Sequence, residues 1–414
     1  MPRFQSAVGE DGWQRVREVG EAGLLVGIPS FNNAATIGHV VRASAEGLAL
    51  HFPSERGVVV VSDGGSSDGT LQVVRDTPVP DGVEKVVLAY RGLPGKGSAF
   101  RAIFEIARTL GVRACVVVDS DLRSITPGWI GLLAGPVLEG SFGYVAPYYV
   151  RHKYDGTITN SIAYPLTRAL YGVGVRQPIG GDFGFSARLL EHYLGQDVWE
   201  SDVARFGIDI WMTTTAINEG FRVCQAQLGA KIHDAKDPAA SLGPMFRQVV
   251  GTLFDLMGRY RDRWPKVKGS SPAPLVGEAV GVEPEEVPVT VPAMIARFRE
   301  GCSRHWDLWM EVLAPETLGQ LNGIAGLDDG AFRFPVDLWV RVIYDFAVAY
   351  QLRGADAGEM LESLTALYYG RTAAFCRETA HMTTAQVEAG VIEAVAARFE
   401  ELKPYLLERW ELVG

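Results

Sequence analysis

The chain has 414 residues and a formal net charge of −10, with 47% hydrophobic and 21% charged residues. This length exceeds the size at which one core usually stops growing, so we expect two domains in a globular protein, and the composition argues against a disordered chain. The negative charge argues against a nucleic-acid partner, because phosphate backbones require a basic surface.

No window is apolar enough to span a bilayer, and the N-terminus lacks an apolar core of signal-peptide length. We therefore expect a cytoplasmic protein without an integral membrane segment. The four cysteines are far apart and show no metal-binding spacing, so we expect buried thiols in a reducing compartment.

The first part of the chain alternates short apolar runs with helical patterns. The expected strands cover residues 24–28, 58–61, 86–88 and 116–118, and the expected helices cover 36–50, a segment from about 71, and 98–110. This alternation predicts an α/β fold with a mostly parallel, doubly wound, Rossmann-like sheet. In such sheets ligands bind beyond the carboxyl ends of the strands.

Polar residues follow each of these expected strands. Ser30, Asp63, Lys96 and Asp121 each come shortly after one of the four apolar runs. The glycines in residues 62–70 would let the backbone approach a ligand closely. Four such loops at a common edge predict a binding site there.

The fourth apolar run ends in Asp119-Ser120-Asp121. If the strand continues through these residues, both carboxylates point to one face and approach the same small volume. Their repulsion then calls for a divalent cation, Mg²⁺ or Mn²⁺, holding a diphosphate. A solvated strand end or a helix cap is the alternative explanation for an isolated Asp-x-Asp.

The pattern changes after residue 129. We expect strands over 142–150 and 221–228, a helix over 157–171, a helix that opens with residues 205–211, and a glycine-dense loop over 177–185 that carries Asp182. The second strand leads to His233, which charged residues surround. The basic cluster Arg151-His152-Lys153 is suited to an anionic acceptor, or is a solvated basic turn.

The last third of the chain is predicted to be helical. Residues 265–292 are rich in Pro, Gly, Val and Glu and are expected to form a linker. Helix-period spacing then covers 294–313, 336–352, 360–377 and 384–410, with Asp356 and Thr384 as candidate caps. We therefore expect a catalytic domain over 1–264, a linker over 265–292 and a helical C-terminal domain over 293–414.

Several motifs together resemble those of GT-A glycosyltransferases. They are Val26-Gly27-Ile28-Pro29, Ser62-Asp63-Gly64 with Ser67-Asp68-Gly69-Thr70, Pro94-Gly95-Lys96-Gly97, Asp119-Ser120-Asp121, Gln177-Pro178-Ile179-Gly180-Gly181-Asp182, Phe206-Gly207-Ile208-Asp209 and Ile232-His233. Over residues 24–253 the chain resembles the retaining glucosyl-3-phosphoglycerate synthases and the mannosylglycerate synthases. Two departures stand out: Asn32-Asn33-Ala34 replaces the family's usual Asn-Glu-Glu, and Asp182 replaces a glutamate.

The resemblance implies a role for each matching residue. Asp121 and His233 would hold the metal, and an imidazole ligand favours Mn²⁺ over Mg²⁺. The catalytic group would comprise Asp209, which orients the acceptor hydroxyl or sugar, together with Asp182 and Gly181. The substrate-binding group would comprise Pro29, Ser30, Asn32, Asp63, Lys96, Asp119, Ser120 and Gly180, with Asp63 at the base and Asp119 at the ribose or sugar. Arg151 of the basic cluster is added to this group because of its charge, as a candidate contact of an anionic acceptor.

The resemblance also implies the reaction. It predicts metal-dependent, anomer-retaining transfer of glucose or mannose from a UDP- or GDP-sugar to glycerate or 3-phosphoglycerate, giving compatible solutes such as glucosylglycerate or mannosylglycerate. We expect a homodimer. The alternatives are an inverting glycosyltransferase acting on a polyprenyl phosphate or a polysaccharide, a sugar nucleotidyltransferase, and a non-catalytic sugar-nucleotide sensor.

Overall fold

The computed structural model describes residues 6–233, 243–278, 283–353 and 357–412. The chain divides into two compact units, one comprising Met1–Val150, Val175–Asp234 and Ala273–Pro284, and the other Arg151–Gly174, Ala235–Pro272 and Glu285–Gly414. Segments that we expected in the catalytic domain thus group with the C-terminal helices. The domain boundaries that we expected, 1–264, 265–292 and 293–414, stay a prediction.

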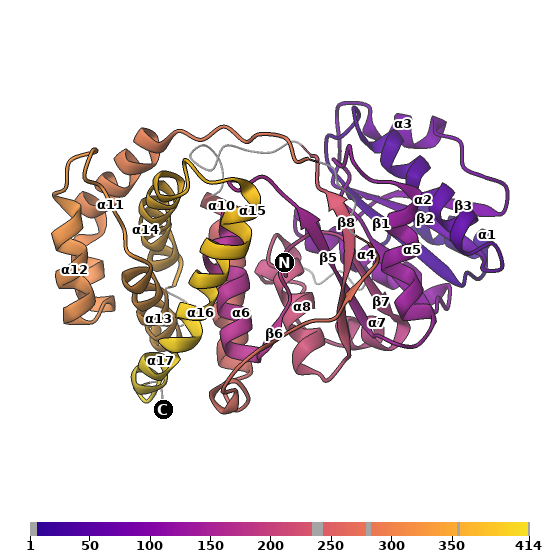
Figure 1. Ribbon diagram of the computed structural model, residues 1–414. Helices are drawn as coiled ribbons and strands as arrows, with labels where there is room; N and C mark the ends of the chain where they lie inside the picture. Colours follow the sequence, from indigo (N-terminus) through magenta and orange to yellow (C-terminus); the bar gives the residue numbers. More distant parts are fainter. Residues whose placement is uncertain (1–5, 234–242, 279–282, 354–356, 413–414) are drawn as a thin grey trace. The chain divides into compact units, whose positions relative to one another are not determined.

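The first unit is built on an eight-stranded sheet (Figure 1) in the order β10-β8-β5-β7-β4-β1-β2-β3. Its strands are β1 (Leu24–Ser30), β2 (Gly57–Asp63), β3 (Val83–Ala89), β4 (Ala114–Val117), β5 (Tyr144–Val150), β7 (Phe183–Ser186), β8 (Val223–Ala230) and β10 (Leu275–Val276). Only β7 runs antiparallel to its neighbours β4 and β5 in these pairings. The mostly parallel sheet predicted from the sequence is therefore confirmed.

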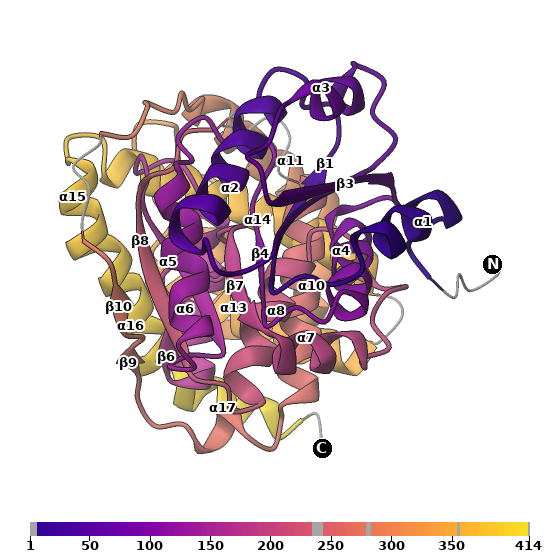
Figure 2. The same cartoon turned by 90° about the vertical axis from the view of Figure 1, so that its right-hand side faces the viewer.

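Helices cover both faces of this sheet. They are α1 (Glu10–Val19), α2 (Ile37–His51), α3 (Thr70–Asp76), α4 (Lys96–Thr109), α5 (Pro127–Leu138), α7 (Ala187–Leu194) and α8 (Ile208–Asn218), with the short η2 (Asp202–Ala204). Figure 2 shows α2 and α5 on one side of β4 and β7, and α4 and α7 on the other. Gly27 of β1 faces α4 so closely that a Cβ would lie 2.4 Å from Ile103 Cγ2. The first unit therefore has the doubly wound α/β fold that we expected.

Strand β7 was not expected, because its sequence lies partly in the segment predicted to be a glycine-dense loop. Phe183 and Phe185 pair with β4, while Gly184 lies between them. A Cβ at Gly184 would lie 1.9 Å from the carbonyl oxygen of Leu133 in α5. Glycine weakens a strand signal, and here it is required because a helix backbone packs directly on the strand.

The second unit is predominantly helical (Figure 1). Its elements are η1 (Thr159–Ala163), α6 (Tyr164–Tyr171), β6 (Val173–Gly174), α10 (Gly243–Arg259), η3 (Trp264–Lys266), β9 (Ser271–Pro272), α11 (Val291–Val312), α12 (Pro315–Ala325), α13 (Val336–Arg353), α14 (Ala357–Glu378), α15 (Thr384–Gln386), η5 (Val387–Ile392), α16 (Glu393–Glu401) and α17 (Lys403–Trp410). Helix α14 packs against α10, α11 and α13 and is buried along most of its length. The predicted helical C-terminal region is confirmed.

The structure refines two details of this region. The helix expected over 384–410 is interrupted at Leu402, just before Pro404 in the first turn of α17. Thr383, not Thr384, is the cap, since its hydroxyl accepts a hydrogen bond from the Gln386 N–H in a capping box. Asp356 lies outside the described residues.

Two further findings concern the whole described chain. Of the helices in the described ranges, none combines the length and the apolar character that crossing a membrane requires. Cys115, Cys224 and Cys376 are buried free thiols, as expected, whereas Cys302 is partly exposed.

Candidate active site

At the carboxyl edge of the sheet, two lysines hold the carboxylate of Asp119. Lys96 Nζ lies 2.8 Å from Asp119 Oδ1, and Lys231 Nζ lies 2.8 Å from Asp119 Oδ2. Lys96 is the first residue of α4, and Lys231 follows β8 directly. Both oxygens of Asp119 are therefore fixed by cations from opposite directions along the sheet.

Asp182 contacts both Asp119 and Lys231 and is completely buried. Its Oδ1 accepts a hydrogen bond from the Asp119 N–H at 2.7 Å, and its Oδ2 lies 3.0 Å from Lys231 Nζ. Tyr149 also donates its hydroxyl to Asp182 Oδ2. Because both oxygens are engaged away from solvent, the geometry suits Asp182 to positioning Asp119 and Lys231.

Asp209, near the start of α8, completes the network through Lys96. Asp209 Oδ2 lies 3.0 Å from Lys96 Nζ. Asp209 Oδ1 is buried and has no hydrogen-bond partner among the described residues. A buried carboxylate oxygen without a donor is costly, so a ligand hydroxyl at this atom would be stabilising.

The network holds three carboxylates and two ammonium groups, and their pKa values diverge. Burial alone would raise the pKa of Asp119, but Lys231 and Lys96 outweigh it and hold that pKa well below its usual range. Burial likewise disfavours the charge on Lys96, yet Asp119 and Asp209 hold its pKa well above the usual range. For Asp182 and Asp209, burial raises the pKa. The lysine contacts thus favour the charged form of Asp119, whereas burial disfavours the charged forms of Asp182 and Asp209.

Gly180 and Gly181 pack against this network with their backbone. Gly181 has φ +93°, and a Cβ there would lie 2.1 Å from Asp119 Oδ2. The Gly180 carbonyl accepts a hydrogen bond from Lys231 Nζ at 2.7 Å, and a Cβ on Gly180 would lie 2.2 Å from Pro147 Cγ. Both positions require glycine for the loop to reach Asp119.

A second polar cluster lies where β1 and β2 end. Asp63 is completely buried, and its Oδ2 accepts hydrogen bonds from the Ser30 hydroxyl at 2.7 Å and the Ser66 hydroxyl at 2.6 Å. Its Oδ1 accepts from the backbone N–H groups of Gly65 and Ser66 at 2.8 Å and 2.7 Å. Asp63 thus holds the glycine-rich loop in place, and its hydrogen bond from Ser30 ties this loop to the end of β1.

Loop residues join this cluster to the strand end that carries the two acids. Asn32, at φ +55°, accepts a hydrogen bond from the Ser67 N–H at 3.0 Å. Ser120 donates its hydroxyl to Asn33 Oδ1 at 2.7 Å, and its carbonyl accepts from the Thr36 hydroxyl at 2.8 Å. Pro29 is buried within β1. The predicted nucleoside residues therefore occupy one continuous stretch of the sheet edge.

Asp121 and His233 form a separate pair. His233 Nδ1 lies 3.7 Å from Asp121 Oδ2, and the two side chains are 19% and 30% exposed. Their loops are held together because the Arg123 N–H donates to the Ile232 carbonyl at 2.8 Å and the Ile232 N–H donates to Ser124 Oγ at 2.9 Å. One carboxylate and one imidazole fit a divalent cation that keeps open positions for phosphate and water. Within the described ranges, no group of three or more His, Cys, Asp or Glu residues is arranged to hold a metal ion.

The strand geometry expected for Asp119 and Asp121 is not present. Strand β4 ends at Val117, so the alternation of side chains along a strand does not extend to either acid. Asp119 instead meets Lys96 and Lys231, and Asp121 meets His233.

One residue of the network, Lys231, was not predicted, and one predicted residue, Arg151, belongs to the second unit. Lys231 was missed as a site residue, although it stands two positions before His233. A lone lysine after a strand gives no signal of its own, because its partners lie 112 and 49 positions away. Arg151 belongs to the second unit, where its Nε lies 3.3 Å from Asp155 Oδ2. Its role at an acceptor stays a prediction.

Residues 25–193 match the family model of glycosyl transferase family 2. The matched stretch runs from β1 into α7 and carries Asp63, Lys96, Asp119, Asp121 and Asp182. The chain therefore carries a nucleotide-sugar glycosyltransferase domain of GT-A type, and the resemblance seen in its motifs is confirmed at that level. A comparison with curated protein sequences found no match.

Among solved structures, the chain is similar to glucosyl-3-phosphoglycerate synthase from Mycobacterium tuberculosis. The complex with Mg²⁺ and uridine diphosphate is 23% identical, with a TM-score of 0.46 over 62% of this chain and 85% of that one. The complex with Mn²⁺, UDP-glucose and phosphoglyceric acid is 23% identical, with a TM-score of 0.43 over 62% and 85%. The complex with Mn²⁺, uridine diphosphate and glucosyl-3-phosphoglycerate is 22% identical, with a TM-score of 0.45 over 70% and 94%.

Proposed function

We propose that the protein transfers a hexosyl group from a nucleotide diphosphate sugar to a small hydroxy acid, glycerate or 3-phosphoglycerate, with a divalent metal and with retention at the anomeric carbon. The observation that carries this proposal is the arrangement at the sheet edge. The Asp121–His233 pair, 3.7 Å apart, stands beside a carboxylate that two lysines hold, Asp119. The match to glycosyl transferase family 2 supports the choice of donor class.

The proposed metal ligands are Asp121 and His233. A bound divalent cation would offset the negative charge that develops on the leaving diphosphate. The imidazole ligand favours Mn²⁺ over Mg²⁺, because imidazole nitrogen is a softer donor than carboxylate or water oxygen.

Asp119 would orient the donor by accepting hydrogen bonds from hydroxyls of the ribose or the sugar. Each of its oxygens already has a lysine 2.8 Å away, so its lone pairs are aimed before the substrate binds. Asp182 fixes this orientation from below through the Asp119 N–H. Such preorganisation lowers the cost of reaching the transition state, because the dipoles need not reorient during the reaction.

Asp209 would orient the acceptor hydroxyl through its unengaged oxygen, Oδ1. In the proposed front-face reaction, the bond between the anomeric carbon and the phosphate oxygen breaks as the bond to the acceptor oxygen forms. The acceptor proton passes to a phosphate oxygen of the departing nucleotide. Asp119 is poorly suited to act as a covalent nucleophile, because two ammonium groups hold both of its oxygens.

The stereochemistry can be tested directly. Proton NMR of the product should give the anomeric coupling of the donor sugar, unchanged in configuration. An inverted anomeric centre would contradict the front-face mechanism. A glycosylated polyprenyl phosphate that extracts into organic solvent would instead identify a lipid-linked acceptor.

The metal site can be tested by thermal shift with UDP- and GDP-sugars, with and without Mn²⁺. A ligand that binds only the native state raises its apparent stability, by about 2.7 kcal/mol at a hundredfold excess over Kd. Asp121→Ala and His233→Ala should each abolish the Mn²⁺-dependent part of this shift. Asp81→Ala, an exposed position, serves as the control. An unchanged Mn²⁺-dependent shift in both site variants would refute the proposed ligands.

A further inference from the structure

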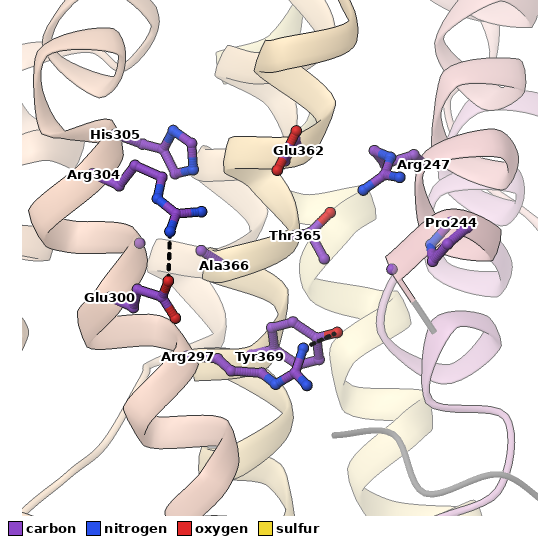
Figure 3. A pocket seen from close by; sticks show the side chains of 12 residues that line it. Pro244, Arg247, Arg297, Glu300, Arg304, His305, Glu362, Thr365, Ala366 and Tyr369 are labelled. Carbon is purple, nitrogen blue, oxygen red and sulfur yellow. Dashed lines mark hydrogen bonds and ion pairs between the residues drawn. The ribbon is translucent and has the colours of Figure 1, made fainter. Parts of the chain in front are cut away.

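Three helices of the second unit, α10, α11 and α14, line a cavity of about 300 Å³ that is open to solvent at Arg297, Glu300 and Arg304 (Figure 3). It lies within that unit and uses none of the residues assigned above. Its lining residues come from one side of each helix, and they include Arg247 from α10, Arg297 and Arg304 from α11, and Thr365 and Tyr369 from α14.

Small residues let α11 and α14 approach each other closely beside the cavity. Gly301 of α11 packs so closely on α14 that a Cβ there would lie 2.2 Å from Ala366 Cβ. Gly301 and Ala366 also line the cavity, together with Gly243 at the start of α10. Large side chains would fill this space in an ordinary helix interface, so the sequence leaves a hollow between the charged residues of its wall.

The guanidinium group of Arg297 lies beside the hydroxyl of Tyr369, and that of Arg247 lines the same cavity. Arg297 Nη1 donates to that oxygen at 3.4 Å, and the Arg297 guanidinium lies 5.1 Å from the centre of the same ring. A Cβ built on Gly243 would lie 3.9 Å from Tyr369 Oη and 3.9 Å from Arg247 Nη1, so both atoms face the space beside Gly243. Figure 3 shows Arg247 and Arg297 reaching into the cavity from different helices.

The wall carries three arginines and two glutamates, Glu300 and Glu362, so positive charge is in excess by one. Arg304 is paired with Glu300, with Nη2 and Oε1 2.6 Å apart. Neither Arg247 nor Arg297 forms an ion pair with any carboxylate in the described part of the chain. Both guanidinium groups line the same cavity, and an anion bound there would be attracted to both.

We propose that this cavity binds a small phosphate ester. A phosphate monoester carries about −1.5 to −2 charges near neutral pH, which matches two guanidinium groups, and its oxygens suit their bidentate donors. Because Arg297 donates to the oxygen of Tyr369, the hydroxyl proton of Tyr369 is free to donate to a phosphate oxygen. The volume exceeds that of a phosphate group, and Thr365 and Glu362 in the wall can bind hydroxyls of the organic part.

The site is tested by isothermal titration with glycerol 3-phosphate, without metal or nucleotide sugar, so that the result does not depend on transferase activity. Arg247→Gln and Arg297→Gln should each weaken binding about tenfold or more, as expected for loss of a hydrogen-bonded charge. Arg247→Lys keeps the charge and should weaken it less. Arg261→Gln, an exposed arginine just beyond α10, is the matched control and should leave binding unchanged.

Two further measurements decide the result. Unfolding temperatures of the variants should equal that of the wild-type protein, because both arginines lie in the cavity wall and not in the core. Glycerol should not bind, since it lacks the phosphate. No binding of glycerol 3-phosphate to the wild-type protein, or equal binding by the wild-type protein and both glutamine variants, would overturn the proposal.

Discussion

The structure requires glycine at position 181 for two reasons, its backbone conformation and the lack of space for a side chain, and Gly181→Ala tests both. Its φ of +93° strains any L-amino acid side chain, and its Cβ would lie 2.1 Å from Asp119 Oδ2. The unfavourable φ strains only the backbone. The added Cβ would displace the Asp119 carboxylate that Lys96 and Lys231 hold.

The magnitudes of the two effects can be separated. A left-handed backbone conformation costs alanine about 1–2 kcal/mol, and overpacking in a filled interior adds about 1–3 kcal/mol. Gly220, at φ +77°, has no atom within 4 Å of its would-be Cβ, so Gly220→Ala meets only the first cost. We expect Gly220→Ala to lose about 1–2 kcal/mol of unfolding free energy, and Gly181→Ala about 2–5 kcal/mol.

Urea denaturation of the two variants measures this difference, and titration with a UDP- or GDP-sugar measures its effect on the site. Gly181→Ala should also weaken donor binding, because Asp119 must move, whereas Gly220→Ala should bind the donor like the wild-type protein. Equal unfolding free energies and equal donor affinities for the two variants would refute the close packing of Gly181 on Asp119.

Two further predictions concern the same network. Lys231→Met should lower the unfolding free energy by about 3–5 kcal/mol in urea denaturation, because it leaves the carboxylates of Asp119 and Asp182 without their shared cation, and an unchanged denaturation midpoint would contradict this. Since the lysines hold the pKa of Asp119 below its usual 3.8, Asp119 contributes stability above pH 3.8 that is lost as the pH falls through its folded-state pKa. The destabilisation caused by Asp119→Asn, measured against the wild-type protein, should therefore shrink as the pH falls below 3.8, and a constant difference would exclude this linkage.

The sheet and its polar edge could be predicted because their signals are local. Four apolar runs mark β1 to β4, and each is followed within a few residues by polar or glycine-rich sequence. Parallel connectivity then places these loops at one edge without any knowledge of side-chain contacts. Strand β7 escaped prediction for the opposite reason, because Gly184 gives no strand signal and its need for glycine comes from a helix elsewhere in the chain.

Lys231 could not be predicted because its importance is set by distant partners. It lies after β8, whereas Asp119 follows β4 and Asp182 immediately precedes β7. These three strand ends meet only because β7 lies between β4 and β5, with β8 next to β5. Because the antiparallel strand β7 was not predicted, the contact between Asp182 and Asp119 could not be predicted either.

The end of β4 explains why two carboxylates so close in sequence can serve different partners. Ser120, between them, is fixed on both sides: its hydroxyl donates to Asn33 and its carbonyl accepts from Thr36. With Ser120 held against the loop after β1, Asp119 turns toward the lysines and Asp121 toward His233. Because Lys96 and Lys231 neutralise Asp119, a cation at Asp121 would not need to compensate two adjacent carboxylates. Asp121 therefore remains available to a metal, while Asp119 remains an acceptor for hydroxyl groups.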